Sequence, residues 1–384
     1  IYLKKKTCEI IGNGLNGFSY KKKITLNAGN SGTLGRLILG LLVHSKKKIV
    51  LKGDKSLSKR DFSRVTNPLQ KFGARFTTTN GKLPITIIGT KTPKKIQYKE
   101  TKGSAQCKSS VMLAAINTPG KTIIKAKKSR DHSEILFKYL NLQIDIKKKK
   151  KFDLIKIIGG KSIKAFNYKV PSDLSSSAFF IVLTALSKNS KLKIKNVNLN
   201  PSRIGVLKIL KKMNVKFELR NKKIYKGEKM GDILIYSSKN LKSIKCPVSL
   251  NSAAIDEFLL IFLVAAKANG ISYFKGLSEL NQKESPRLIW ASKILRKIGV
   301  KIITTKDSIK IFGNPKLKIN KKIIIKNFLK DHRVFMTSVI AALSFGGEWI
   351  IHDKESIKTS FPKFLEIINQ LKKWKKEKIL LRLQ

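Results

Sequence analysis

Five helix starts recur along this chain at a nearly constant interval. Each start carries small or polar residues and is followed by an apolar helical pattern, and successive starts lie about 70 to 80 residues apart. They are Ser31-Gly32-Thr33, Ser104-Ala105-Gln106, Asp173-Leu174-Ser175, Ile255-Asp256-Glu257 and Lys330-Asp331-His332. A period of this size is typical of a fold built from copies of one unit. It also predicts several helix N-termini whose free backbone N–H groups could bind anions.

A second series of predicted helices alternates with the first. Four of its starts carry an arginine and the fifth keeps only the apolar spacing: Arg60, Arg130, Arg203, Arg287 and Ser360-Phe361-Pro362. Short β-branched runs lie between the helices, at 48–51, 122–124, 192–194 and 233–235. Strands that alternate with helices predict an α/β fold. The first series, nearly all apolar over 179–186 and 258–266, is expected inside the domains, and the amphipathic second series outside.

The length and charge of the chain limit its class. At 384 residues it is too long for one ordinary core, which predicts two domains, 1–170 and 171–384. The formal charge of +59 would suit a polyanion partner. However, only 11 of the 82 basic residues are arginine and the lysines are spread throughout, so a lysine-rich composition is preferred and no nucleic-acid partner is expected. The arginines at helix starts are then informative, because a guanidinium can bind carboxylate or phosphate through two hydrogen bonds.

Several classes of protein are disfavoured. Cys8, Cys107 and Cys246 are far apart and suit reduced thiols, with Cys107 expected as a packing residue rather than a nucleophile. Four scattered histidines have no metal-ligand spacing, so neither a metal nor a cofactor is expected. No apolar run is long enough to predict a membrane span. A cytoplasmic location is expected by default, with a plastid as the alternative if a transit segment was removed.

Polar groups cluster at two of the predicted helix starts in the first half of the chain. Segment 30–36 combines glycines with hydroxyls, which would let an anion approach the backbone closely, although an ordinary capped helix is the simpler explanation of this segment alone. Ser104, Gln106 and Lys108 present a hydroxyl, an amide and an amine on one helical turn. That combination suits a sugar-like phosphate.

Carboxylates stand beside cations at starts in the second half. Asp256 and Glu257 lie in the apolar run 253–266, where a carboxylate is costly unless it is partnered or in a helix's first turn. Segment 283–287 brings Lys, Glu and Arg within five residues, and 331–333 is Asp-His-Arg. An acid–base pair flanked by cations suits chemistry on a carboxylate or phosphate. Helix-dipole complementarity is the alternative for the first pair.

Seven short strings share one order along nearly the whole chain. They are Gly53-Asp54-x-Ser56-Leu57-x-x-Arg60, Ser104-Ala105-Gln106-x-Lys108-Ser109, Ser129-Arg130-Asp131-His132, Asn200-Pro201-Ser202-Arg203-x-Gly205, Lys283-Glu284-Ser285-x-Arg287, Asp331-His332-Arg333 and Ser360-Phe361-Pro362. In this order they resemble the 5-enolpyruvylshikimate-3-phosphate synthase family of enolpyruvyl transferases. The resemblance implies a two-domain inverse α/β barrel of βαβαββ repeats, with the active site in the cleft between the domains.

The resemblance also implies an activity. The enolpyruvyl group of phosphoenolpyruvate would move to the 5-hydroxyl of shikimate 3-phosphate with release of phosphate, a step of chorismate and aromatic amino acid biosynthesis. The enzyme would act as a monomer, and a fixed array of charges would serve in place of a metal. The first domain would lie on the shikimate 3-phosphate side, and the second would carry the catalytic carboxylates and the cations for phosphoenolpyruvate.

Individual roles follow from the same resemblance. Phosphoenolpyruvate would be held by Gly32, Thr33, Arg60, Lys283, Arg287, Arg333 and Lys358. Shikimate 3-phosphate would be held by Ser104, Ala105, Gln106, Ser129, Arg130 and Asp256. Asp256 would be the base for the 5-hydroxyl, and Glu284, alone or with Lys283, the acid that protonates the methylene carbon. Gly32 predicts sensitivity to glyphosate, because a larger residue at this family position obstructs the inhibitor.

The match departs from the family in two residues, in the C-terminal segment 370–377 and in the number of repeats. Asp61 stands where Pro usually follows Arg60, and Pro286 stands where Asp usually precedes Arg287, although Pro is tolerated in a first helical turn. Two domains of three repeats need six inner helices, whereas five are predicted, and the family's first string, Lys-Ser-x-x-x-Arg, is not found in 1–30. The chain therefore looks like an enzyme without its first repeat, and little or no turnover is expected from these residues alone.

Three alternatives stay open. The related transferase that acts on UDP-N-acetylglucosamine needs a reactive cysteine near an arginine, a context that none of the three cysteines offers. A polyanion-binding protein would use the charge of +59 and release no phosphate. A decayed copy of the enzyme would fold poorly. Measurement of phosphate release separates all three from the preferred interpretation.

Overall fold

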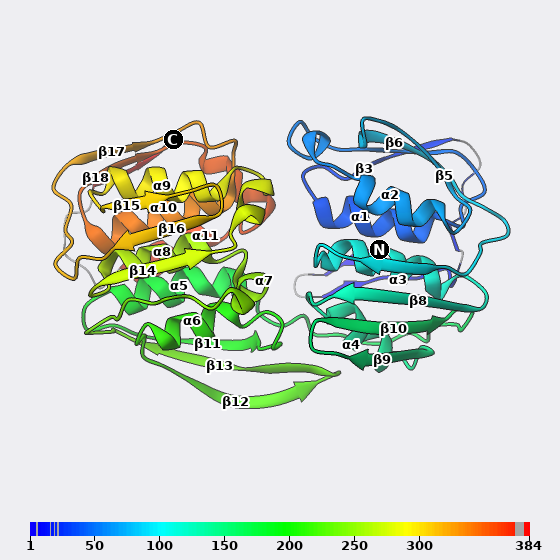
Figure 1. Cartoon of the computed structure of the whole chain (residues 1–384), viewed down its shortest axis with the longest axis horizontal. Helices are drawn as coiled ribbons and strands as arrows, with labels where there is room; N and C mark the ends of the chain where they lie inside the picture. The colour runs from blue at the N-terminus through cyan, green and yellow to red at the C-terminus, as the bar shows by residue number, and fades with distance from the viewer. Residues whose placement is uncertain (5–6, 16, 19, 21–22, 373–379) are drawn as a thin grey trace. The chain divides into compact units, whose positions relative to one another are not determined.

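The predicted helix starts of the first series all begin helices in the computed structural model, which describes residues 1–4, 7–15, 17–18, 20, 23–372 and 380–384. The helices are α1 (Gly32–Leu42), α3 (Ala105–Ile116), α5 (Leu174–Leu186), α8 (Phe258–Lys267) and α10 (His332–Phe345) (Figure 1). Four of the starts are capped by a side chain whose oxygen accepts a backbone N–H: Ser31, Ser104, Asp173 and Asp331. The predicted starts are thus confirmed.

The second series also forms helices. They are α2 (Ser63–Gln70), α4 (His132–Tyr139), α6 (Gly205–Lys212), α9 (Arg287–Lys297) and α11 (Phe364–Lys372). α2 begins after a short 3-10 turn, and the Asp61 carboxylate accepts the backbone N–H of Ser63 at 2.8 Å. The aspartate that replaces the family's Pro therefore supports the start of this helix. α9 begins directly after Pro286, so the helix persists as predicted.

The chain forms two units, residues 1–168 and 169–384, whereas the boundary expected from the sequence is 170. In its described residues, unit 1 has two four-stranded sheets, with strand orders β3-β4-β6-β5 and β7-β8-β10-β9. The strands are β3 (Ile24–Asn27), β4 (Ile49–Lys52), β5 (Arg75–Thr79), β6 (Lys82–Ile88), β7 (Gln97–Glu100), β8 (Lys121–Lys127), β9 (Ile144–Lys148) and β10 (Phe152–Ile158). The first two strands of each sheet are parallel and the others antiparallel, which gives two βαβαββ copies.

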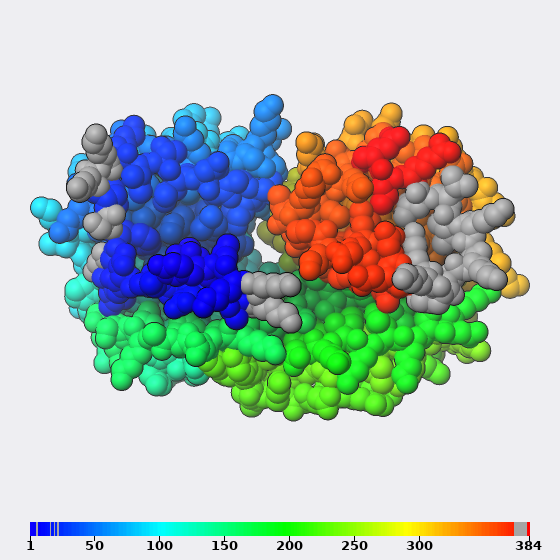
Figure 2. Space-filling model, turned by 180° about the vertical axis from the view of Figure 1, so that it is seen from behind, coloured from blue at the N-terminus to red at the C-terminus, as the bar shows by residue number. Residues whose placement is uncertain are grey.

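Helices fill the space between the two sheets of unit 1. Figure 1 shows α1, α2 and α3 between them. A short exposed hairpin, β1 (Tyr2–Leu3) with β2 (Cys8–Glu9), precedes the first copy, and its region forms the dark-blue strip on the surface in Figure 2. α1 and α3 meet at Gly40, where an added Cβ would lie 2.1 Å from the carbonyl oxygen of Ser110. Only glycine fits such a contact, so the two backbones touch there.

The described part of unit 2 has three sheets of three strands, with orders β11-β13-β12, β14-β16-β15 and β17-β18-β19. The strands are β11 (Lys191–Asn198), β12 (Phe217–Tyr225), β13 (Glu228–Tyr236), β14 (Ile271–Lys275), β15 (Ile302–Thr304), β16 (Ser308–Phe312), β17 (Lys322–Ile325), β18 (Glu348–Ile351) and β19 (Leu380–Leu383). In the first two sheets the opening strand is reduced to isolated parallel bridges, at Ser172, Lys242 and Lys245. The third sheet is parallel throughout.

The first-series helices lie in the interior of unit 2, as predicted, and the core also includes apolar residues of the second-series helices α6, α9 and α11. α5, α8 and α10 contact one another, and α8 is buried from Phe258 to Ala266. A short helix, α7 (Asn251–Ala254), precedes α8. Asp256 is one of the two residues between the end of α7 and Glu257, the N-cap of α8. No helix in the described part of the chain is long and apolar enough to cross a membrane.

Candidate active site

In unit 1, the paired N-termini of α1 and α3 join three predicted site residues. The Gln106 side-chain amide donates to the Thr33 hydroxyl at 2.8 Å. Arg36 donates through Nη1 to the Gln106 amide oxygen at 3.0 Å and to the Gly32 carbonyl oxygen at 3.3 Å. Gly32, Thr33 and Gln106 therefore belong to one hydrogen-bond network. Its fourth member, Arg36, has no role assigned from the sequence.

Two guanidinium groups approach Gly32. A Cβ added at this glycine would lie 2.7 Å from Nη1 of Arg36 and 2.7 Å from Nη1 of Arg60. Burial and the nearby charge of Arg60 lower the pKa of Arg36. Two like charges beside a helix N-terminus form an arrangement that an anion would stabilise. This supports the prediction that Arg60 and Gly32 share one anionic ligand.

The remaining predicted residues of unit 1 lie at the starts of α3 and α4. Ser104 caps α3, since its hydroxyl accepts the backbone N–H of Cys107 at 3.2 Å, and Ala105 is the first residue of the helix. Ser129 and Arg130 follow β8 and precede α4, and the Arg130 carbonyl oxygen accepts a hydrogen bond from Lys108 of α3 at 2.9 Å. The chain thus brings both groups of residues to the start of α3.

Cys107 itself lies inside the core of unit 1. Its side chain is buried among apolar residues, and burial raises the pKa of the thiol. Both facts oppose the formation of a thiolate nucleophile. Cys107 is therefore a packing residue, as expected from the sequence.

In unit 2, Asp256 lies among three cations. Lys283 Nζ is 3.2 Å and Arg287 Nη1 3.5 Å from Oδ1 of Asp256, and Arg203 Nη1 is 3.7 Å from Oδ2. The Asp256 side chain is largely buried, with 13% of its surface exposed. Lys283 and Arg287, to which the family resemblance assigns phosphoenolpyruvate binding, thus contact the candidate base. Arg203 is a further contact, and its motif alone does not indicate this role.

Arg287 is the centre of a buried ion-pair network. Its Nε donates to Asp331 Oδ2 at 2.9 Å and its Nη2 to Asp331 Oδ1 at 3.3 Å, and Nη2 also pairs with Glu284. The Ser285 hydroxyl donates to Asp331 Oδ2 at 2.8 Å. Arg287 therefore pairs with three carboxylates, Asp331, Glu284 and Asp256, although Pro286 precedes it in the sequence. The sequence assigns no role to Asp331.

The network shifts the ionisation of both partners. Burial alone would lower the pKa of Arg287, but its carboxylate neighbours, Asp331 first, raise it above the ordinary value. Burial alone would raise the pKa of Asp331, but Arg287 and the hydrogen bonds to it hold that pKa at about 2, against an ordinary 3.8. Both groups are therefore charged at neutral pH.

This shift predicts acid-sensitive stability. A carboxylate with a lowered folded-state pKa stabilises the fold above about pH 4, and this stabilisation, about 2 kcal/mol for Asp331, is lost as the pH falls through about 2. We therefore expect the stability difference between the unsubstituted protein and the Asp331→Asn variant to shrink by that amount between about pH 5 and pH 2. Urea unfolding at the two pH values measures it. A difference that does not change with pH would contradict the assignment.

Two further predicted residues, Arg333 and Lys358, differ in whether they contact Asp256. Arg333 Nη1 donates to the Asp256 carbonyl oxygen at 3.0 Å and lies 4.0 Å from Glu257 Oε1. Arg333 therefore joins the cluster of charged residues around Asp256, which also contains Lys283, Arg203 and Arg287. Next to it, burial and the charge of Arg333 lower the pKa of His332 to about 4. Lys358 is 70% exposed and pairs with Glu355 in a 3-10 helix. Among the described contacts, Lys358 is not joined to the cluster.

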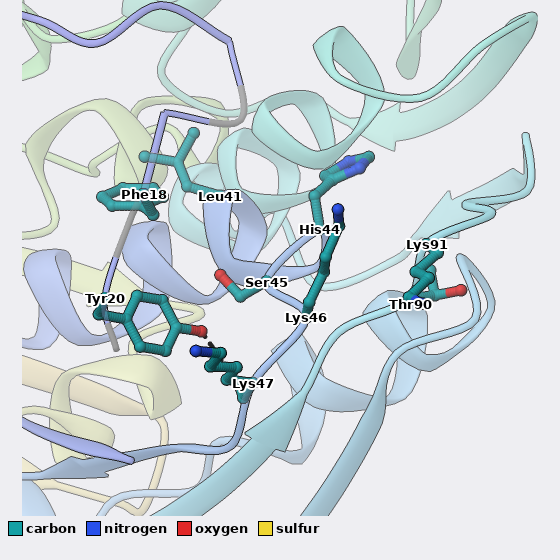
Figure 3. Close-up of a pocket in the computed structure, with 9 residues that line it drawn as sticks. All are labelled: Phe18, Tyr20, Leu41, His44, Ser45, Lys46, Lys47, Thr90 and Lys91. Carbon is teal, nitrogen blue, oxygen red and sulfur yellow. Dashed lines mark hydrogen bonds between the residues drawn. The ribbon is translucent and has the colours of Figure 1, made fainter. Parts of the chain in front are cut away.

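A hollow of about 440 Å³ lies at the other end of α1 from Gly32. Figure 3 shows Leu41, near the end of the helix, beside Phe18, and Tyr20 beside Lys47, among the residues that line the hollow. The Tyr20 hydroxyl donates to the carbonyl oxygen of Lys47 at 3.0 Å. The residues that line this hollow include none of the predicted site residues, and its lysines match the lysine-rich composition of the chain.

The described residues also bear on metal binding. Among them, no group of three His, Cys, Asp or Glu side chains is placed to hold a metal ion. The polar groups described above are instead cations, amides and hydroxyls, together with carboxylates that are paired with cations. Such groups suit binding of an organic phosphate or carboxylate and transfer of protons.

Known proteins share this fold and sequence. The chain matches the family described as EPSP synthase (3-phosphoshikimate 1-carboxyvinyltransferase) over residues 1–368. It is 42% identical to a 3-phosphoshikimate 1-carboxyvinyltransferase of Ruthia magnifica subsp. Calyptogena magnifica, over 94% of this chain and 81% of the relative. The enzyme of the same name from Petrotoga mobilis is 38% identical, with coverage of 94% and 82%.

Solved structures agree. An EPSP synthase from Acinetobacter baumannii superposes with a TM-score of 0.80 at 36% identity, covering 94% of this chain and 81% of that one. The enolpyruvyl transferase NikO from Streptomyces tendae has a TM-score of 0.66 at 13% identity, covering 87% and 75%, which shows a shared fold. The two-domain α/β fold expected from the resemblance is thus confirmed. The chain belongs to the EPSP synthase family, the 3-phosphoshikimate 1-carboxyvinyltransferases.

Proposed function

We propose that this chain transfers the enolpyruvyl group of phosphoenolpyruvate to the 5-hydroxyl of shikimate 3-phosphate through the two clusters described above. The observation that carries the assignment of roles is the contact of Asp256 with Lys283 and Arg287. It puts a proton acceptor, a proton-bearing amine and a guanidinium within one site. Both substrates are multiply anionic, which matches the cations of each cluster.

The proposed reaction balances with these groups. In the first step the 5-hydroxyl oxygen of shikimate 3-phosphate bonds to C2 of phosphoenolpyruvate, and Asp256 accepts the proton of that hydroxyl. Glu284 or Lys283 delivers a proton to the methylene carbon at the same time. In the second step that carbon returns a proton as the bond from C2 to the phosphate oxygen breaks and phosphate leaves. Fixed cations stabilise the charge that develops on the leaving phosphate. Lys283 lies 3.2 Å from Asp256, close enough for a proton to pass between them.

The binding residues divide into two groups, one for each substrate. Phosphoenolpyruvate would be held by Gly32, Thr33, Arg60, Lys283, Arg287, Arg333 and Lys358, as the family resemblance implies. Ser104, Ala105, Gln106, Ser129, Arg130 and Asp256 would hold shikimate 3-phosphate. We propose that the enzyme is a monomer that uses neither metal nor cofactor, so that EDTA leaves its rate unchanged.

One assay tests the proposal. Purified chain is mixed with both substrates, released phosphate is measured, and the organic product is identified by mass spectrometry. Phosphate and enolpyruvylshikimate 3-phosphate in equal amounts support the proposal, and they contradict the expectation from the repeat count that these residues alone turn over little or nothing. Phosphate release only when UDP-N-acetylglucosamine replaces shikimate 3-phosphate would support the related transferase, and salt-dependent retention on nucleic acid without phosphate release would support the polyanion alternative.

Gly32 gives a second test, because the proposed phosphoenolpyruvate site also admits glyphosate. The Cβ of the Gly32→Ala variant would displace the ends of Arg36 and Arg60, which are flexible and can move without unfolding the protein. We expect the glyphosate concentration for half-inhibition to rise about tenfold or more, the size of effect that one misplaced contact of about 1.4 kcal/mol produces. The KM for phosphoenolpyruvate should rise less. Equal inhibition of both proteins would contradict the placement of Gly32 in this site.

A further inference from the structure

A buried ion pair joins α3 to α4 in unit 1. Lys108 Nζ pairs with Glu134 Oε1, and the two side chains are only 1% and 4% exposed. Removing two such charges from water costs more than their attraction usually returns, so an apolar pair of similar size is often as stable or more stable. Stability alone therefore does not account for the pair.

The pair has a third member. Lys108 Nζ also donates to the carbonyl oxygen of Arg130 at 2.9 Å. Nearby, the hydroxyls of Ser109 and Ser133 share a hydrogen bond of 2.6 Å, so α3 is tied to this region at two successive residues. A charged donor holds a carbonyl more firmly than a neutral one does. The peptide group of Arg130 is thus fixed from inside the protein.

Two buried oxygens beside this contact have unfilled hydrogen-bonding capacity. In the described part of the chain, neither Ser129 Oγ nor Glu134 Oε2 has a hydrogen-bond partner, and both atoms are buried. The pKa of Glu134 lies above its ordinary value, because burial raises it by more than the charge of Lys108 lowers it. Unsatisfied buried oxygens are expensive, so each one calls for an explanation beyond the stability of the fold.

We infer that Lys108 and Glu134 are positioning residues, which fix the Arg130 carbonyl and thereby hold Ser129 and Arg130 in place for shikimate 3-phosphate. The inference rests on the proposed function, because it needs that substrate to bind at this loop. In this role neither of the two side chains needs to contact the substrate. They act through the backbone of the two residues that do.

The decisive comparison uses a single and a double variant. Lys108→Met leaves Glu134 buried without its cation, whereas Lys108→Met with Glu134→Met replaces the pair by apolar side chains of similar length. We expect the single variant to lose both stability in urea and affinity for shikimate 3-phosphate, the latter about 10- to 100-fold, as for loss of a hydrogen bond from a charged group. The double variant should regain the urea midpoint but not the affinity. Glu134→Gln, which keeps an acceptor for Lys108, should bind more tightly than either.

Val111→Ala provides the matched control. Val111 lies on the same helix, is fully buried and contacts no predicted site residue through a polar group. We expect this variant to lose stability with less than a threefold change in affinity, measured by isothermal titration with shikimate 3-phosphate. Recovery of both properties in the double variant would overturn the inference, as would unchanged affinity in Lys108→Met. If the unsubstituted protein does not bind shikimate 3-phosphate, the proposed function itself fails.

Discussion

Arg287→Met should lower the free energy of unfolding by about 3 to 5 kcal/mol, the range measured when one partner of a buried ion pair is removed. The substitution leaves Asp331, whose side chain has no exposed surface, without the two hydrogen bonds that Arg287 donates to it. Glu284 and Asp256 lose the same guanidinium. Urea unfolding at neutral pH measures the effect.

An exposed arginine on the same unit gives the control. Arg220 pairs with Glu218 on β12, and the two side chains are 55% and 48% exposed. Because surface pairs contribute about 0 to 1 kcal/mol, Arg220→Met should change stability by no more than that. The assignment of Arg287 as the centre of the network is wrong if the two variants lose similar stability. Arg287→Lys, which keeps the charge but not the two parallel hydrogen bonds, should fall between them.

Asp256→Asn should reduce the rate of phosphate release by about 10³-fold, within the range that a positioned general base contributes. The carboxamide keeps the size of the side chain but cannot accept the proton of the 5-hydroxyl. The contacts of Lys283, Arg203 and Arg287 with this side chain weaken at the same time. The assay needs enough protein for the unsubstituted rate to stand well above background.

Asp232 supplies a matched carboxylate outside the cluster. It lies on β13 with Lys193 Nζ at 3.1 Å, so Asp232→Asn also removes a charge beside a lysine. We expect the turnover of this variant to stay within about threefold of the unsubstituted protein, as for changes remote from the chemistry. A loss of less than tenfold in Asp256→Asn would mean that another group is the base. Urea midpoints of both variants separate catalysis from folding.

The helices could be predicted because their signals are local. Ser31, Ser104 and Asp173 precede apolar helical patterns, and each caps its helix through contacts only a few residues long. The strands follow the same logic where a full β-branched run is present. Where the opening strands shrink to isolated bridges, at Ser172 and Lys242, too few residues pair to leave a strand pattern in the sequence.

The site was predictable in its residue types and less so in its contacts. The meeting of Asp256 with Lys283 and Arg287 joins segments about 30 residues apart, and only the family resemblance indicates it. The pairing of Arg287 with Asp331 spans 44 positions, and no local pattern encodes such a distance. The burial of Lys108 is harder still to predict, because a lysine in a lysine-rich chain is expected at the surface.

The backbone contact between α1 and α3 explains why a high lysine content at the surface need not disturb this part of unit 1. At Gly40 the helices touch without an intervening side chain, so the spacing between Thr33 and Gln106 depends on two main chains. Lysine can replace other residues across the surface without changing that spacing. A charge of +59 is therefore compatible with the close approach of α1 and α3 in unit 1, whereas a single methyl group at position 40 is not.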